Sequence, residues 1–110
     1  MKHNPDEMLV RCILQALQNT VSRILIYGET TGKTTTDIAV ITPYKINEDQ
    51  EARLSNTVAE FNKKHDGKYS VIDIDCSAFT EKREEIPLYQ FIQQTGIELW
   101  PKKNSIRTIL

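Results

Sequence analysis

The stretch ILIYGETTGKTTTDIAVI, residues 24–41, decides how this 110-residue chain folds. Two short apolar runs rich in β-branched residues, 24–27 and 38–41, flank a polar loop of glycine and threonine. Runs of this length and composition favour buried strands over helices. Gly28, directly after the first run, lets the backbone approach a ligand closely. Asp37, at the entrance to the second run, is placed to face the same spot.

One interpretation of this loop is a phosphate-binding P-loop. The residues Gly28, Gly32, Lys33 and Thr34 give G-x-x-x-G-K-T, one residue shorter than the P-loop pattern. A P-loop must open a helix whose N-terminus faces the phosphate. Only two residues separate this sequence from Asp37 and the next apolar run, and no helix fits between them. We therefore favour another interpretation of the loop.

Composition and charge limit the class of protein. The length suits one small domain with a single hydrophobic core. The formal net charge of −1 gives no overall basic footprint, so general binding of nucleic acid is not expected. No signal peptide and no run long enough to span a membrane is present, so membrane association is not expected. Cys12 and Cys76 lack zinc-ligand spacing, and we expect them to be reduced in a cytoplasmic protein.

Capping residues and periodicity predict the other elements. Asn4 followed by Pro5 begins a helix, and Asn47 with Gln50 resembles a capping box. The first predicted helix begins within residues 4–7 and continues to 17, and two others run over 48–65 and 87–94. The remaining strands are predicted over 69–76 and 97–100. Residues 80–85 are predicted as a loop or an early helical turn. His65, at a helix end beside an Asp-Gly turn, is expected to be solvated rather than a metal ligand or base.

The stretch 24–41 resembles the signature of the minimal nucleotidyltransferases of the polymerase β superfamily. In that family a strand ends in Gly-Ser, a loop carries a second glycine, and the next strand opens with Asp-x-Asp before an apolar run. Gly28 and Gly32 match the two glycines. Asp37, followed by Ile-Ala-Val-Ile, matches the second aspartate and the strand after it.

The resemblance is incomplete at the chemical positions of the motif. Glu29 stands where the family has serine, and Thr35 stands where it has the first aspartate. The loop is also several residues shorter than usual. The ending IQQTGIELW, residues 92–100, is similar to the family's close, in which Arg-Glu-Gly ends a helix and Val-x-Leu-Tyr follows. This second match supports the resemblance independently of the glycine loop.

The fold implied by the resemblance is α+β. We expect a small mixed sheet of about three to four strands backed by helices, in the order α-β-β-α-β-α-β. Residues 1–101 would form the nucleotidyltransferase-like domain, and 102–110 would be a C-terminal tail. This tail carries three basic residues and ends in Ile-Leu, so it is either disordered or docks on a partner.

The third metal-binding carboxylate of the family lies on a strand like YSVIDIDC. Asp73 and Asp75 are two residues apart and point to one face of that strand. The resemblance makes Asp73 the first choice for a catalytic carboxylate, with Asp75 as a further metal ligand. The family pattern can instead place Ser70 at the third position. Alternatively, the two aspartates form only the solvent face of an antiparallel strand.

The activity implied by the resemblance is transfer of a nucleotide from an NTP through two Mg²⁺ ions held by carboxylates. Asp37 and Asp73 would be catalytic. The nucleotide-binding residues would be Gly28, Glu29, Gly32 and Lys33, and the metal ligands would be Asp37, Asp73 and Asp75.

The two substitutions in the motif argue against ordinary catalysis. Thr35 removes an anionic ligand shared by both metals, and Glu29 adds negative charge where phosphate oxygens should lie. Rescue would need Glu29 to act as a displaced metal ligand and Lys33 to hold phosphate. We therefore predict a degenerate domain that binds a partner, such as a helical HEPN-type toxin or a second copy of itself. The alternative is an active Mg²⁺-dependent enzyme that transfers NMP to a protein or a small-molecule acceptor.

Overall fold

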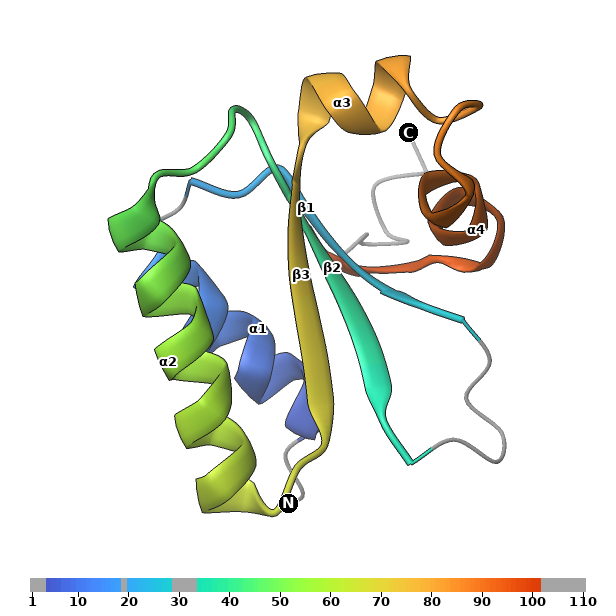
Figure 1. Ribbon diagram of the computed structural model, residues 1–110. Helices are drawn as coiled ribbons and strands as arrows, with labels where there is room; N and C mark the ends of the chain where they lie inside the picture. Colours follow the sequence, from blue (N-terminus) through green and yellow to red (C-terminus); the bar gives the residue numbers. More distant parts are fainter. Residues whose placement is uncertain (1–3, 19, 29–33, 102–110) are drawn as a thin grey trace, which may run out of the picture.

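The strands assemble into one mixed sheet with helices on both faces (Figure 1). The computed structural model describes residues 4–18, 20–28 and 34–101. The helices are α1 Pro5–Ala16, α2 Glu48–His65, α3 Cys76–Glu81 and α4 Pro87–Thr95, and the strands are β1 Arg23–Tyr27, β2 Thr36–Thr42, β3 Tyr69–Asp75 and β4 Ile97–Trp100. The predicted α+β architecture is confirmed.

Local capping chemistry places the two long helices as the sequence predicts. The Asn4 side chain accepts a hydrogen bond from the Asp6 N–H at 2.8 Å and begins α1. Asn47 and Gln50 form the predicted capping box at the start of α2. Asp66 ends α2 in the left-handed conformation, with φ of 52°.

The strand order is β3-β2-β1-β4. β1 and β2 are antiparallel, β2 and β3 are parallel, and β4 pairs antiparallel with β1 at the other side of the sheet. The parallel pair needs a crossover connection, and α2 provides it. As a result, β3 lies at one edge of the sheet and β4 at the other, as Figure 1 shows.

The sheet divides the hydrophobic core into two clusters, one on each face, where the sequence predicted a single core. One core joins α1 and α2 to one face and includes Ile13, Ile38 and Phe61. The other lies under α3 and α4 and includes Phe79 and Ile92. Successive strand residues alternate between the two faces, so the side of the sheet on which a polar strand residue lies is fixed by its position.

One short helix was not predicted. The structure has two helices between β3 and β4, and the first of them, α3, begins at Cys76, which the sequence analysis assigned to the preceding strand. The Asp75 carboxylate accepts a hydrogen bond from the Ala78 N–H at 2.8 Å, and this cap turns the chain from strand to helix. Among the described helices, none is long and apolar enough to cross a membrane.

Candidate functional site

The candidate site lies where β1 ends and β2 begins. Gly28 follows β1 with φ of 81°, a conformation that favours glycine. Its N–H donates a hydrogen bond to Thr95 Oγ1 at 2.9 Å, and the Thr95 hydroxyl donates in turn to the Phe91 carbonyl at 2.7 Å. The N–H that a phosphate-binding turn would offer to its ligand is therefore bonded to the end of α4.

The rest of the glycine loop, residues 29–33, lies outside the described residues. The nucleotide-binding roles of Glu29, Gly32 and Lys33 therefore stay predictions. Gly28 is the predicted nucleotide-binding residue that the structure describes, and it lies at the turn as expected.

Asp37 lies between a tyrosine and a serine on the neighbouring strands. Its partners in register are Tyr27 on β1 and Ser70 on β3. Residues in register direct their side chains to the same face of a sheet. Burial of the Tyr27 phenol, and then the negative charge of Asp37, raise the pKa of Tyr27. A phenol, a carboxylate and a hydroxyl thus share one face of the sheet.

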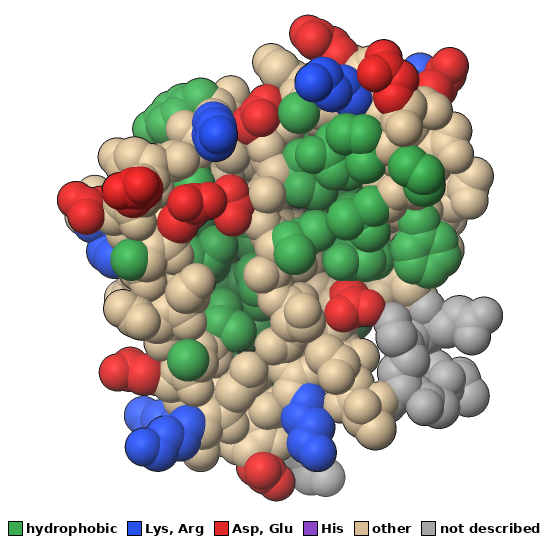
Figure 2. Space-filling model, in the orientation of Figure 1, with side chains coloured by type: hydrophobic (Ala, Val, Ile, Leu, Met, Phe, Trp, Pro, Cys, Tyr) green, Lys and Arg blue, Asp and Glu red, His purple; other side chains and the backbone are tan. Residues whose placement is uncertain are grey.

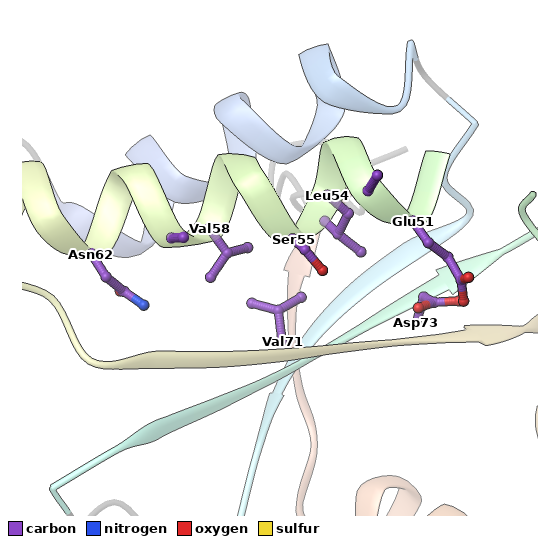
Figure 3. A pocket seen from close by; sticks show the side chains of 9 residues that line it. Glu51, Leu54, Ser55, Val58, Asn62, Val71 and Asp73 are labelled. Carbon is purple, nitrogen blue, oxygen red and sulfur yellow. The ribbon is translucent and has the colours of Figure 1, made fainter. Parts of the chain in front are cut away.

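Asp73 points to the opposite face from Asp37. It pairs in register with Val40, three residues along β2 from Asp37. An odd separation reverses the face, and three residues of strand span about 10 Å. Asp73 lies in a groove beside α2, together with Glu51 (Figure 3). Its predicted partnership with Asp37 is therefore not formed.

Asp75 is the N-cap of α3. Its carboxylate caps α3, as described above, at the C-terminal end of β3, whereas Asp37 pairs with Ser70 near the N-terminal end of that strand. The structure thus does not bring Asp37, Asp73 and Asp75 together. Asp73 and Asp75 lie on one strand as the sequence predicts, but the sequence does not determine which face of the sheet Asp37 shares. Ser70, the alternative for the third position, is the residue that lies beside Asp37.

The described residues do not fit a two-metal site. Magnesium prefers several oxygen ligands, and a two-metal site needs carboxylates that hold both ions. Within the described ranges, no three acidic, histidine or cysteine side chains are grouped closely enough to hold a metal ion. The group around Asp37 offers one carboxylate, with neutral hydroxyls at Ser70 and Tyr27.

Two residues of this site were not recognised from the sequence. Tyr27 was counted with the apolar strand, although its position directly before the glycine brings its ring to the site. It packs edge-to-face with Phe91 of α4, with ring centroids 6.3 Å apart. Thr95 was placed directly after the predicted helix 87–94. A threonine in a helix commonly donates its hydroxyl to the carbonyl four residues earlier, so the bond from Thr95 to Phe91 could have been predicted. The bond that Thr95 accepts from the Gly28 N–H could not, because the two residues are far apart in the sequence.

Comparison with known proteins relates this fold to antitoxin structures. No family model and no curated protein matches the sequence. Among solved structures, the MntA-HepT toxin-antitoxin matches with a TM-score of 0.57 and 18% identity, covering 88% of this chain and 71% of the other. A structure of a tri-AMPylated HEPN toxin with MNT antitoxin from Shewanella oneidensis matches with a TM-score of 0.57 and 14% identity, covering 94% and 76%. A toxin-antitoxin with AMP-PNP matches with a TM-score of 0.60 and 16% identity, covering 94% and 84%. The chain has the fold of these minimal nucleotidyltransferase antitoxins.

Proposed function

We propose that this chain acts by binding a protein partner, as an antitoxin-like module whose nucleotidyltransferase site is degenerate. The observation that carries the proposal is the register of β2 with β3. It sets Ser70 beside Asp37 and turns Asp73 to the other face of the sheet. The fold of a nucleotidyltransferase is thus retained, whereas the described residues do not supply its carboxylate set.

The chemistry of the site supports this choice. Two Mg²⁺ ions carry four positive charges, and carboxylates must offset them for the ions to be held. At the described site Asp37 supplies one such charge, while Thr35 and Ser70 supply only neutral hydroxyls at the two other positions of the family motif. The Gly28 N–H is engaged by Thr95 rather than open to a phosphate. These features favour protein binding over nucleotide transfer.

The proposed partner is a helical HEPN-type protein. The similar structures are complexes between MNT antitoxins and HEPN toxins, and that likeness supports the same partner class here. This chain also has hydrophobic side chains at the surface of α4: Leu88 and Phe91 are exposed, and Tyr89 of the same helix is partly buried against the core under α3 and α4. Figure 2 shows hydrophobic side chains gathered over this face of the molecule. A surface of this kind suits the apolar side of a partner helix.

Co-expression tests the partner. The tagged chain is expressed with each HEPN-type protein of its own genome, and one is expected to co-purify as a stable complex. Leu88→Asp should weaken that complex at least about tenfold, because it places a charge in the apolar surface. Tyr44→Asp is the matched control, since Tyr44 is also an exposed hydrophobic residue but lies after β2. Failure of every candidate to co-purify would contradict the proposal.

Calorimetric titration with Mg²⁺-ATP, and then with the other NTPs, tests the alternative. The proposal predicts no metal-dependent binding heat from the folded protein. Heat that requires Mg²⁺ and disappears in Asp37→Ala would show a working carboxylate site. An active Mg²⁺-dependent nucleotidyltransferase would then replace the degenerate module as the function.

A further inference from the structure

A groove runs between α2 and the edge strand β3, away from the candidate site. Its volume is about 570 Å³. Leu54 and Val58 of α2 and Val71 of β3 give it an apolar base, and the small residues Ala52 and Ser55 keep its helix wall low. Figure 3 shows the side chains of α2 directed toward β3 along its length.

The backbone of β3 along this groove faces outward. β3 is the edge of the sheet, and the Thr36 N–H donates to the Lys68 carbonyl at 2.8 Å. That bond sets the phase of the parallel ladder, in which every second residue faces the neighbouring strand. The N–H and C=O groups of Tyr69, Val71 and Asp73 therefore point away from β2, toward the space where a further strand would lie.

One of these residues is already paired by a substitute for a strand. The Asn62 side-chain amide donates to the Tyr69 carbonyl and accepts from the Tyr69 N–H, both at 3.0 Å. An amide side chain bonded in this way reproduces the two bonds that a residue of a neighbouring strand would make. It closes one end of the groove and leaves Val71, two residues along, as the next outward-facing position.

The other end of the groove is acidic. Glu51 and Asp73 both line it, and Figure 3 shows them at the same end of the cavity. Two carboxylates there favour a Lys or Arg and disfavour an acidic segment. β3 carries only acidic charges, Asp73 and Asp75, so β3 of a second copy would not supply the base.

We infer that this groove binds an extended segment of a partner polypeptide, added as a strand along β3, with alternate apolar side chains and a Lys or Arg at the Glu51–Asp73 end. Main-chain bonds to Val71 and Asp73 would provide affinity, and the acidic end would provide direction and specificity. The inference rests on the proposed partner-binding function only for its biological role. Its test uses peptides and β3 variants, so its failure is separate from failure of the HEPN complex.

A fluorescent eight-residue peptide of alternating Val and Thr, with one terminal Lys, is the probe. Anisotropy titration against the full chain should show saturable binding. The same peptide with Glu in place of Lys should bind at least about fivefold more weakly. A version N-methylated at alternate amides, made in both phases, should lose at least about tenfold in the phase that faces β3.

Val71→Pro tests the role of the β3 backbone. It removes one outward N–H and leaves the bonds to β2, which come from the residues on either side. It should weaken peptide binding at least about tenfold, whereas Val71→Thr, which keeps the N–H, should bind as the parent does. If Val71→Pro proves unfolded by circular dichroism, the double variant Glu51→Gln with Asp73→Asn replaces it, and the preference for Lys over Glu should disappear.

Several results would overturn the inference. One is absence of saturable binding by any of the peptides; another is equal binding of the parent peptide and both methylated forms. A third is equal affinity of the proline and threonine variants. Analytical sedimentation tests whether a second copy of the chain occupies the groove. If the parent is a dimer and Val71→Pro is a monomer, the edge of β3 binds a second copy and not a partner peptide.

Discussion

At the residue scale, the Asn62 side chain links α2 to the start of β3. It lies on α2 and satisfies both outward-facing backbone groups of Tyr69 at the start of β3. Buried or partly buried backbone groups that lose their partners destabilise the folded state, whereas exposed side chains of a helix contribute little. The two bonds from Asn62 should therefore contribute to the stability of the fold.

Asn62→Ala should lower the free energy of unfolding by about 1–3 kcal/mol, because it leaves two backbone groups without their protein partners. Urea denaturation measures the change. Asn56→Ala is the matched control, since Asn56 is an exposed asparagine of the same helix. Equal losses in the two variants would mean that the bonds to Tyr69 do not stabilise the fold.

The half-buried Tyr69 predicts an alkaline loss of stability. Burial raises the pKa of Tyr69, and the hydrogen bond to Asp6 and the charge of Asp6 raise it further. The folded state thus holds the phenolic proton more tightly than the unfolded chain. The protonated Tyr69 phenol therefore stabilises the folded state. This contribution is fully present below the ordinary tyrosine pKa of about 10, and it is lost as the pH rises through the pKa of Tyr69 in the folded state.

Tyr69→Phe should therefore flatten the fall in stability above about pH 10. The urea midpoints of the parent and the variant are measured across that pH range and subtracted. The effect of lysine titration is common to both proteins, so it cancels in the difference. Tyr44→Phe is the control, because Tyr44 is exposed. An equally steep fall in Tyr69→Phe would exclude this tyrosine as the source.

At the element scale, α3 shows where local sequence patterns were insufficient. The helices that begin with Asn4 and Asn47 were predicted because each cap lies before a long periodic segment. α3 has six residues and one buried side chain, Phe79, so periodicity is too short to indicate it. Asp75 was therefore assigned to metal binding, although its spacing to Ala78 also suits an N-cap.

Asp75→Ala should destabilise the protein by about 1 kcal/mol through loss of the α3 cap. Asp73→Ala, two residues earlier on the same strand, should change the free energy of unfolding by less than about 0.5 kcal/mol. Urea denaturation of both variants compares them directly. A larger loss for Asp73→Ala than for Asp75→Ala would contradict the assignment of Asp75 as the cap.

At the scale of the whole molecule, the sheet separates the acidic residues that the sequence analysis grouped. The four strands and their order along the chain could be predicted, because each strand is a short apolar run bounded by turn residues. The pairing of Asp37 with Ser70 rather than Asp73 could not, because it depends on the register of β2 and β3 across the helix α2. No local pattern determines that register, so the resemblance favoured Asp73 and left Ser70 as the alternative.

The register predicts that one substitution will create a metal site. Ser70→Asp places a second carboxylate in register with Asp37 on the same face of the sheet. Without metal, the two like charges should repel and lower the melting temperature. Mg²⁺ should reverse this loss, because two carboxylates and waters make an acceptable octahedral site. At a concentration ten times the Kd, the stabilisation should be about 1.4 kcal/mol.

Ser70→Asn is the matched control for that variant, because it places a neutral side chain of the same size at the same position of β3. Thermal unfolding with and without Mg²⁺ should show metal-dependent stabilisation of Ser70→Asp and none of Ser70→Asn or the parent. Adding Asp37→Asn to Ser70→Asp should remove the response, since one carboxylate then remains. If Ser70→Asp does not respond to Mg²⁺, its carboxylate does not lie beside Asp37. The register of β2 and β3 on which the degenerate site depends would then be wrong, and catalysis would regain ground over partner binding.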